Sequence, residues 1–527
     1  MFYKILSKAI KEVMLSQEEG KKDVEDEMKT YYWAMNEQQR QLGLREILSY
    51  VENSVELYLF ILSYLMQLLN DRKIAELIIE ILNSENDLTL VNKINILGQL
   101  NRSILFCKFD MPDMEKSKIF RQLFERQLKE TMHKLNQNIS YIPYAARNQN
   151  RIIMLIEPML GTRHAPTKKM VNIYHYLEAL GYDVYIYATN YELVQMAEIT
   201  YWWKAAVTNA LFEENTEFSL DYYGVQVKGC YVMYSEDNYF DTIRSIREEI
   251  RRFNPAFVLT IGDDNILGDS CEQFTDVVTM GCTNTVPITT SRMIARYFFD
   301  TEETREHFKK CLGETQTVID YIHVEELEEQ EVSEHTRESL QIGEKDFVII
   351  IAGHRLDDEV KQDTIDVLNI ILEEELQCKV LFIGNCEKLK ERLQRNQYWK
   401  RFRFVGETEN FRATIALGDL FLNPPRKGGG TGALYAAQSE VPVLTLGHCD
   451  VANIGEEFVC ERLEDMPQIV HKYVNDAKFM QQQKAYCRKN AGKIGSINNI
   501  EQTKKFCRDV EAAIKEKEKM LGEANDE

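Results

Sequence analysis

The chain has 527 residues, 44% of them hydrophobic and 28% charged, and its formal net charge is −21. This length exceeds what one hydrophobic core normally serves, so we expect a globular protein of two or three domains. Because phosphate contact needs clustered Lys and Arg, the acidic charge argues against a broad nucleic-acid-binding surface. It equally disfavours general adhesion to anionic membranes.

The sequence pattern predicts neither a secretory leader nor a transmembrane segment. Residues 1–12 lack an apolar core followed by a cleavage site. The longest apolar stretch, residues 55–69, is shorter than the ~20 residues that span a bilayer, so we expect a buried helix there. The 11 cysteines form no Cys-x-x-Cys pair, and the histidines show no ligand-like spacing. These features favour reduced thiols in a cytoplasmic protein.

Residues 1–147 are expected to form an all-helical domain. Apolar side chains recur there at helical spacing, as at Ile74, Leu77, Ile78, Ile81 and Leu82, and glycine is rare. No fixed repeat length is visible, which argues against a solenoid. We expect this accessory domain to bind an acceptor or a partner, or to cap the next domain. It is also a candidate surface for homo- or hetero-oligomer formation.

From residue 148 the pattern changes to alternating strands, loops and helices. An apolar strand at 151–156 precedes a loop that contains His164. A later strand, 256–261, delivers Asp263 and Asp264 to its carboxyl end. In α/β folds this is the edge of the sheet where ligands bind, so these polar residues are candidate site residues.

The segment after residue 417 is the most informative part of the sequence. The apolar run 418–423 predicts a buried strand, two prolines end it, and a run of glycines then permits a tight turn into a helix. Such a unit aims backbone N–H groups and a positive helix end at one point, where a phosphate would sit. An arginine and a lysine add two cations at the same corner. The residues of this corner are Arg426, Lys427, Gly428, Gly429, Gly430, Thr431 and Gly432.

Four ordered strand–loop units after residue 345 resemble a known family. They are residues 346–355, 379–384, 402–407 and 418–446. The last unit reads D-x-F-L-N-P-x-R-x-G-G-G, followed by a helix and P-V-L-T. The order of these parts resembles the donor half of the nucleotide-sugar glycosyltransferases with the GT-B fold. The resemblance implies an α/β protein in which two Rossmann-like domains face each other across a cleft, here preceded by the helical domain.

The resemblance also implies a domain order. It predicts an acceptor domain at 148–325 and a nucleotide-sugar donor domain at 340–498, joined by a charged connection. Residues 499–527 are expected to form a helix that crosses back to the first Rossmann-like domain.

The family's activity implies transfer of a sugar from a nucleotide-diphosphate sugar to a protein or glycan acceptor, in bacterial-type glycan or glycoprotein biosynthesis. No cofactor is implied beyond this donor substrate. The resemblance adds further donor contacts to the glycine-rich corner, namely His354, Arg355, Gly406, Glu407 and Asp450. If the enzyme inverts the sugar's configuration, it needs a base near the acceptor hydroxyl, and Asp263, Asp264 and His164 are the candidates.

The sequence also predicts a reaction that does not depend on a metal ion. The chain lacks an Asp-x-Asp at a strand end, and the adjacent Asp263 and Asp264 would point apart on an extended strand. Cations and helix ends are therefore the expected means of neutralising the departing diphosphate. We expect no metal site.

One departure from the family pattern leaves a second function open. Retaining family-4-like members carry two glutamates spaced E-x7-E at this helix start, and Lys427 and Tyr435 occupy the matching positions here. The alternative is a noncatalytic GT-B-like subunit that binds the acceptor or stabilises a partner glycosyltransferase. An NAD-dependent oxidoreductase is disfavoured because no G-x-G-x-x-G follows the first strand of either half.

Overall fold

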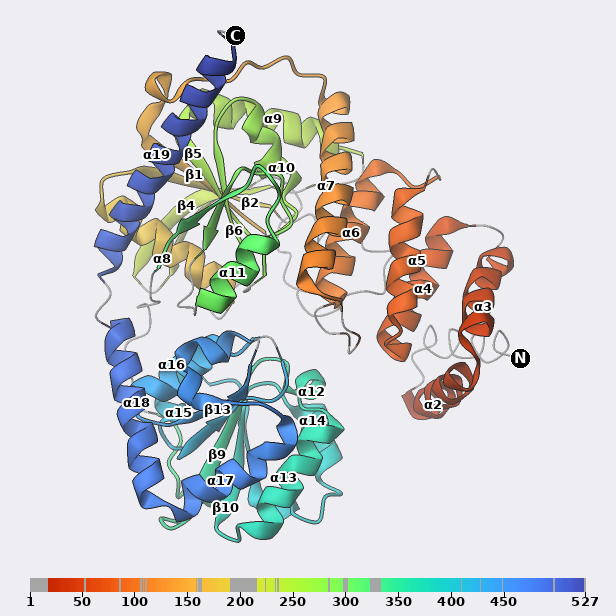
Figure 1. Ribbon diagram of the computed structural model, residues 1–527, viewed down its shortest axis with the longest axis vertical. Coiled ribbons are helices and arrows are strands. Elements are labelled where there is room, and N and C mark those ends of the chain that lie inside the picture. The colour runs from red at the N-terminus through yellow and green to blue at the C-terminus, as the bar shows by residue number, and fades with distance from the viewer. Residues whose placement is uncertain are drawn as a thin grey trace. The chain divides into compact units, whose positions relative to one another are not determined.

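Two sheets, each built mainly of parallel strands, divide the chain into two compact units (Figure 1). The first unit comprises Met1–Arg296, His307–Asp320 and Thr503–Glu527, and the second comprises Tyr297–Glu306 and Tyr321–Gln502. The computed structural model describes residues 18–51, 54–84, 87–104, 107, 109, 111–157, 159, 164–189, 216–222, 224–232, 234, 237–282, 285–296, 302–322, 333–408, 410–426, 428–447, 449–495 and 498–525.

The N-terminal region contains helices and no strand among its described residues. Its helices are α2 (Glu18–Ala34), α3 (Glu37–Tyr50), α4 (Val55–Leu69), α5 (Arg72–Asn83), α6 (Leu90–Ile104) and α7 (Asp113–Leu135). The stripe Ile74, Ile78 and Leu82 of α5 is fully buried, as its helical spacing predicts. The apolar α4 is likewise a largely buried helix of this region. No described helix combines the length and apolar character needed to cross a membrane.

The first sheet has eight strands in the order β3-β4-β2-β1-β5-β6-β7-β8. All neighbouring pairs are parallel except β3 and β4, which form an antiparallel pair that the sequence pattern did not predict. The strands are β1 (Asn148–Ile156), β2 (Asp183–Thr189), β3 (Thr216–Tyr222), β4 (Val225–Val232), β5 (Pro255–Ile261), β6 (Val277–Met280), β7 (Met293–Arg296) and β8 (Thr317–Asp320). The intervening helices are α8 (Ala165–Ala179), α9 (Tyr239–Phe253), α10 (Ile266–Ser270) and α11 (Glu302–Lys310).

One face of this sheet and the helical region share a hydrophobic core. Ile153 and Leu155 of β1 belong to the same buried cluster as the apolar side of α9 and the interior of the N-terminal helices. Alternate residues of a strand point to opposite faces, so Ile152 and Met154 of β1 face the other side. The helical region and this face of the first sheet thus share one core, in which α7 packs against α9 and α10.

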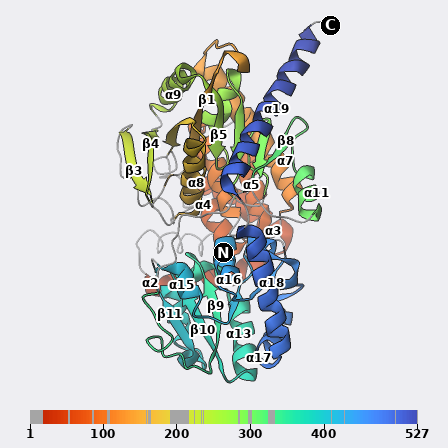
Figure 2. The same ribbon diagram turned by 90° about the vertical axis from the view of Figure 1, so that its left-hand side faces the viewer.

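The last helix, α19 (Asn499–Asn525), also packs on the first sheet. Phe506 of α19 meets Phe257 of β5 edge to face, with ring centroids 6.2 Å apart. At the amino end of β6 the buried carboxylate of Asp276 accepts hydrogen bonds from Lys517 of α19 at 2.7 Å and from Tyr141 at 2.6 Å. The same carboxylate forms an ion pair with Arg147 at 2.8 Å. Figure 2 shows α19 running along this unit beside β1 and β5.

These charges lower the pKa of Asp276. Burial alone raises the pKa of a carboxyl group, but Lys517, Arg147 and the Tyr141 hydroxyl outweigh it. A lowered pKa means that the carboxylate stabilises the fold above its ordinary pKa, and that this stability is lost as the pH falls towards the folded-state value.

We therefore expect Asp276→Asn to destabilise the protein by about 3–5 kcal/mol at pH 7, because it leaves Arg147 and Lys517 without their buried counter-charge. Urea unfolding measures the loss, which should shrink as the pH is lowered below 4. The control is Asp183→Asn, whose ion-pair partner Arg151 is 39% exposed and whose own side chain is 65% exposed. Losing this exposed ion pair should lower the free energy of unfolding by less than ~1 kcal/mol. Equal costs for the two variants would contradict the assignment.

The second sheet has six strands, all neighbouring pairs parallel, in the order β11-β10-β9-β12-β13-β14. They are β9 (Phe347–Ala352), β10 (Cys378–Ile383), β11 (Phe402–Val405), β12 (Leu420–Leu422), β13 (Val443–Leu446) and β14 (Val459–Cys460). The helices are α12 (Leu356–Glu359), α13 (Gln362–Glu374), α14 (Glu387–Leu393), α15 (Phe411–Ile415), α16 (Gly430–Gln438), α17 (Met466–Asn475) and α18 (Ala477–Gly495).

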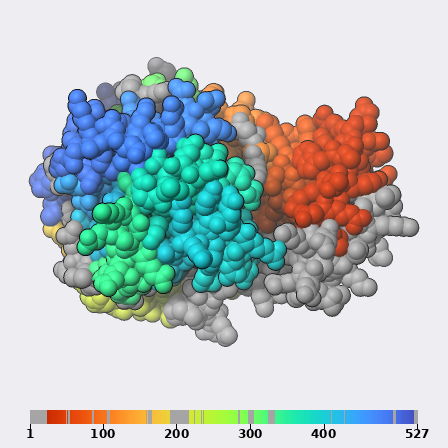
Figure 3. Space-filling view, turned by 90° about the horizontal axis from the view of Figure 1, so that it is seen from below, coloured from red at the N-terminus to blue at the C-terminus, as the bar shows by residue number. Residues whose placement is uncertain are grey.

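Helices cover both faces of the second sheet. Ile349 and Ile351 of β9 join a core with α13 and α17, and Val348 and Ile350 join a second core with α16 and α18. A central parallel strand is buried on both faces, which explains the continuous apolar run of β9. Figure 3 shows one face of this unit, with its later segments in blue beside the earlier segments in green and cyan.

Candidate functional site

The carboxyl edge of the second sheet gathers the residues expected to hold the donor. His354 and Arg355 follow β9, and Gly406 and Glu407 follow β11. The glycine-rich turn follows β12, and Asp450 follows β13. Strands β11, β9, β12 and β13 lie in one parallel sheet, so their carboxyl ends meet at the same edge.

The glycine turn has the backbone geometry that a helix-end anion site requires. Gly429 has φ 106°, a left-handed conformation, and a Cβ there would lie 2.8 Å from both Arg426 Nη2 and Asn423 Oδ1. Helix α16 begins at Gly430 without a side-chain cap from Gly429. The N–H groups of its first turn, which includes Thr431 and Gly432, therefore have no acceptor within the helix.

Asp450 lies beside the start of this helix. A Cβ on Gly430 would be 3.1 Å from Asp450 Cβ, so the absence of a side chain at Gly430 allows this close approach. The structure thus brings Asp450 to the glycine turn.

The guanidinium of Arg426 is buried and hydrogen-bonded within the protein, so it holds the glycine turn in place. Its side chain is only 5% exposed, and its Nη1 donates to Glu359 Oε2 at 2.6 Å. Its Nη2 donates to the Ala352 carbonyl at 2.7 Å, and its Nε donates to Asn423 Oδ1 at 2.7 Å. The guanidinium therefore ties the loop after β12 to the end of β9 and to α12. Residue 427, the second expected cation, lies outside the described residues.

Arg355 is the more accessible cation of this corner. Its side chain is 44% exposed, and its Nη2 donates to Glu359 Oε1 at 2.9 Å. The same nitrogen lies 3.8 Å from where a Cβ of Gly428 would be. Arg355 therefore lies against the glycine turn with a side chain that is far more exposed than that of Arg426.

Glu359, which the sequence pattern did not single out, connects the two arginines. It is 8% exposed and uses one carboxylate oxygen for Arg355 and the other for Arg426. The only sequence signal was its position four residues after Arg355, a spacing that permits an ion pair on a helix.

His354 and Glu407 face each other across the loops after β9 and β11. His354 Nδ1 lies 3.5 Å from Glu407 Oε1, and the two side chains are 61% and 47% exposed. Gly406, next to Glu407, accepts a hydrogen bond from the Gly384 amide at 3.2 Å. The loop pair is therefore a polar, accessible part of the same sheet edge.

The candidate bases lie in the first unit, where the loop after β5 holds two carboxylates in different surroundings. Asp264 is 1% exposed, has φ 47°, and pairs with Arg102 of α6 at 3.4 Å. Its carboxylate lies against Gly98, where any Cβ would overlap it. Asp264 is therefore a buried contact with the helical region and a poor candidate for a base that meets an acceptor.

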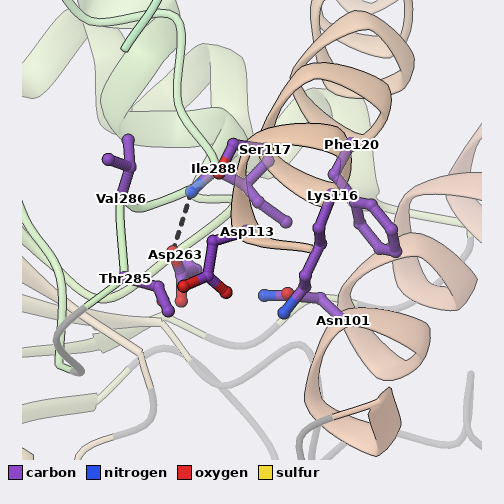
Figure 4. Close-up of a pocket in the computed structure, with 9 residues that line it drawn as sticks. All are labelled: Asn101, Asp113, Lys116, Ser117, Phe120, Asp263, Thr285, Val286 and Ile288. Carbon is purple, nitrogen blue, oxygen red and sulfur yellow. Dashed lines mark hydrogen bonds between the residues drawn. The ribbon is translucent and has the colours of Figure 1, made fainter. Parts of the chain in front are cut away.

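Asp263 remains at the edge of a narrow pocket (Figure 4). Its Oδ1 accepts a hydrogen bond from the Ile288 amide at 2.8 Å. Burial, followed by repulsion from Asp264, raises the pKa of Asp263 to about 6, although the Ile288 amide, Lys116 and Arg102 oppose the shift. A carboxyl group with this pKa is mostly ionised at neutral pH and is a stronger base than an ordinary aspartate.

His164 occupies a different loop. It precedes α8 after strand β1, and its Nδ1 lies 2.9 Å from Thr167 Oγ1. Among the described residues, no group of three or more His, Cys, Asp or Glu side chains is arranged to hold a metal ion.

Solved structures identify the fold. A mutant form of the O-GlcNAc transferase of Thermobaculum terrenum is similar over 97% of this chain and 97% of its own, with 11% identity and a TM-score of 0.56. Anabaena HepE in complex with UDP and glucose matches 68% of this chain and 99% of its own, with 9% identity and a TM-score of 0.48. The E. coli trehalose-6-phosphate protein bound with UDP-2-fluoro glucose matches 68% and 98%, with 8% identity and a TM-score of 0.48. No protein-family profile and no curated protein sequence matches the chain.

The chain has the GT-B fold of the nucleotide-sugar glycosyltransferases. The full-length similarity to the Thermobaculum protein carries this conclusion, and the resemblance found in the sequence is confirmed. In the GT-B fold of this chain, the glycine turn, Arg355 and Glu407 belong to the second Rossmann-like unit, and Asp263 belongs to the first.

The close packing of Arg426 against Gly353 allows its structural role in the second unit to be tested. A Cβ on Gly353 would overlap Arg426 Nη1, and three hydrogen bonds prevent this guanidinium from moving aside. We expect Gly353→Ala to destabilise the protein by about 1–3 kcal/mol. Gly406 also directly follows a strand, but a Cβ there meets nothing within 4 Å, so Gly406→Ala should change stability by less than ~0.5 kcal/mol. Thermal unfolding compares the two, and equal melting temperatures would contradict the role given to Arg426.

Proposed function

We propose that this protein is a glycosyltransferase that moves a sugar from a nucleotide-diphosphate sugar to a hydroxyl group of a protein or glycan. The observation that carries this proposal is the partly exposed side chain of Arg355, which lies against the glycine turn at the start of α16 in a GT-B fold. The similarity to a protein that transfers O-GlcNAc supports it.

The donor half would stabilise the departing diphosphate. Arg355 and the N–H groups at the start of α16 would hydrogen-bond to the phosphate oxygens as negative charge develops on them. The Arg426–Glu359 pair would keep the turn and Arg355 in place. Glu407 and His354, on the neighbouring loop pair, are the proposed contacts of the nucleoside.

The transfer step we propose is a direct displacement. The acceptor oxygen bonds to the anomeric carbon, the bond from that carbon to the diphosphate oxygen breaks, and the nucleoside diphosphate leaves. The acceptor proton passes to the carboxylate of Asp263, which is the best candidate base of the first unit.

A second candidate function is a noncatalytic subunit that binds the acceptor or stabilises a partner glycosyltransferase. The observation that favours it is Tyr435, which takes the place of the second E-x7-E glutamate. Tyr435 is 5% exposed and packs against Phe411, with ring centroids 6.1 Å apart. Retained nucleotide binding without any transfer or hydrolysis of nucleotide sugars would favour this alternative.

Arg355 provides the direct test of the donor site. We expect Arg355→Met to weaken nucleotide-diphosphate binding roughly tenfold to a hundredfold, because a hydrogen bond to a charged group contributes ~1.5–3 kcal/mol. Isothermal titration with UDP, GDP and ADP and the matching nucleotide sugars measures the change. The control is Arg395→Met, at an exposed arginine of the same unit, and it should bind like the wild type. Unchanged affinity in a folded Arg355→Met protein would remove this residue from the site.

Metal dependence is a separate prediction. We expect transfer to continue in EDTA at the wild-type rate, because Arg355 and the α16 N-terminus would supply the positive field at the diphosphate. Nucleotide-diphosphate release with and without EDTA measures this. Activity that disappears in EDTA and returns with Mn²⁺ would contradict the proposal.

A further inference from the structure

The helical region lies on the edge of the first sheet where α/β folds bind ligands. The first turns of α7 and the end of α6 face the loops that follow β5 and β6 (Figure 4). Between them is a narrow pocket lined by Asn101, Asp113, Lys116, Ser117, Phe120, Asp263, Thr285, Val286 and Ile288. The helical region therefore provides one wall of this pocket, and the carboxyl ends of two parallel strands provide the other.

Asp263 presents one fixed and one available carboxylate oxygen in this pocket. Its Oδ1 is held by the Ile288 amide at 2.8 Å, and no described residue forms a hydrogen bond with its Oδ2. Across the pocket, Lys116 is 7% exposed, and its ammonium lies 5.8 Å from the centre of the Phe120 ring. A buried ammonium beside a partly exposed carboxylate at one small pocket is costly for stability alone, which favours a functional reason for their placement.

We propose that α6 and α7 form part of the acceptor site, in which the pocket receives the acceptor's aliphatic hydroxyl beside Asp263 and Lys116 acts as the positioning residue for that carboxylate. This inference rests on the function proposed above. The polar lining of Asn101, Ser117 and Thr285 suits a hydroxyl group, and the apolar Val286 and Ile288 suit the carbon that bears it. The narrowness of the pocket restricts entry to the hydroxyl end of the acceptor.

Lys116 has a specific electrostatic task in this proposal. Asp263 faces Asp264 on its own loop, Arg102 of α6, and Lys116 and Asp113 of α7. Cys282, in the loop after β6, interacts electrostatically with both Asp263 and Lys169 of α8. Removing Lys116 leaves the repulsion from the carboxylates less balanced, so the pKa of Asp263 should rise. Since the base must be ionised, the acidic limb of the rate profile should then move to higher pH.

The experiment compares Lys116→Met with Lys118→Met in the full-length protein. Lys118 carries the same charge on α7 but is exposed, so it is the matched control. Nucleotide binding is measured by titration with UDP, GDP and ADP. Transfer is measured from pH 5 to 9 with two acceptor probes, a serine- and threonine-containing peptide and an octyl glycoside. The two probes separate a protein hydroxyl from a glycan hydroxyl.

We expect Lys116→Met to lower kcat/KM for transfer about tenfold and to shift its acidic limb upward, with nucleotide affinity unchanged. Lys116→Arg should restore the profile, and Lys118→Met should match the wild type. Because Lys116→Met is a core change, Asp263→Asn serves as a second variant, since its amide oxygen can still accept from Ile288. It should lose about 10²-fold or more in transfer while binding nucleotide normally.

Two outcomes separate the inference from the proposed function. If the wild type transfers sugar and both Lys116→Met and Asp263→Asn do so with its rate and pH profile, the pocket is not the acceptor site and the proposed function stands. If the wild type binds none of the nucleotides and transfers to neither probe, the proposed function fails and the inference falls with it. A Lys116→Met protein that loses activity without a pH shift, beside a fully active Asp263→Asn, also overturns the inference.

Discussion

A parallel sheet brings the carboxyl ends of its strands to one edge, and this constraint organises both units of the chain. In the second unit, four strands deliver Arg355, Glu407, the glycine turn and Asp450 to that edge, although they are spread over almost a hundred residues of sequence. In the first unit, the same geometry delivers Asp263 to a pocket beside the helical region. The amino edge has a different task, because Asp276 there ties α19 to the sheet through a buried ion pair with Lys517. The pocket with Asp263 and the buried contacts of Asp276 therefore lie at opposite edges of the first sheet.

Arg426 and Arg355, both beside the glycine turn, show that two residues of the same charge can have different surroundings. Arg426 and Arg355 contact the same carboxylate, that of Glu359, but only 5% of the Arg426 side chain is exposed against 44% of Arg355. A guanidinium whose Nε and both Nη groups donate to Asn423, Glu359 and Ala352 has little capacity left for a phosphate. Breaking its buried pair would leave an uncompensated charge, so the pair fixes the turn geometry on which the exposed arginine depends. The buried arginine holds the turn, and the more exposed one is the arginine that we propose as a ligand contact.

Much of the fold could be predicted because its signals are local. The apolar run of β9, the stripe of α5 and the strand–glycine–helix unit at α16 each follow from neighbouring residues. The antiparallel β3–β4 pair was missed although its signal is local, because only two residues, one of them Gly224, separate the two strands in the sequence. The donor contacts named from the sequence stay a prediction, and their surroundings are not local: nothing in the sequence near Arg426 reveals that Glu359, 67 positions away, accepts a hydrogen bond from its Nη1. In the same way, the contact of Arg102 with Asp264 joins residues 162 positions apart. Long-range pairing of charges was the information that the sequence lacked.

The packing of α16 limits which of its side chains can reach the carboxyl edge of the sheet. Position 435 is a tyrosine buried against Phe411, on a helix whose Ala433, Ala436 and Ala437 also face the core. Gly432 is equally constrained, because a Cβ there would lie 3.2 Å from the Phe421 ring of β12. Beyond its first turn, this side of the helix therefore has no room for a carboxylate that reaches a ribose. Among the described residues, the exposed polar side chains near this edge include Arg355 and His354 after β9 and Glu407 after β11. In this chain, the polar side chains near the glycine turn are therefore carried by the loops after β9 and β11 rather than by the body of α16.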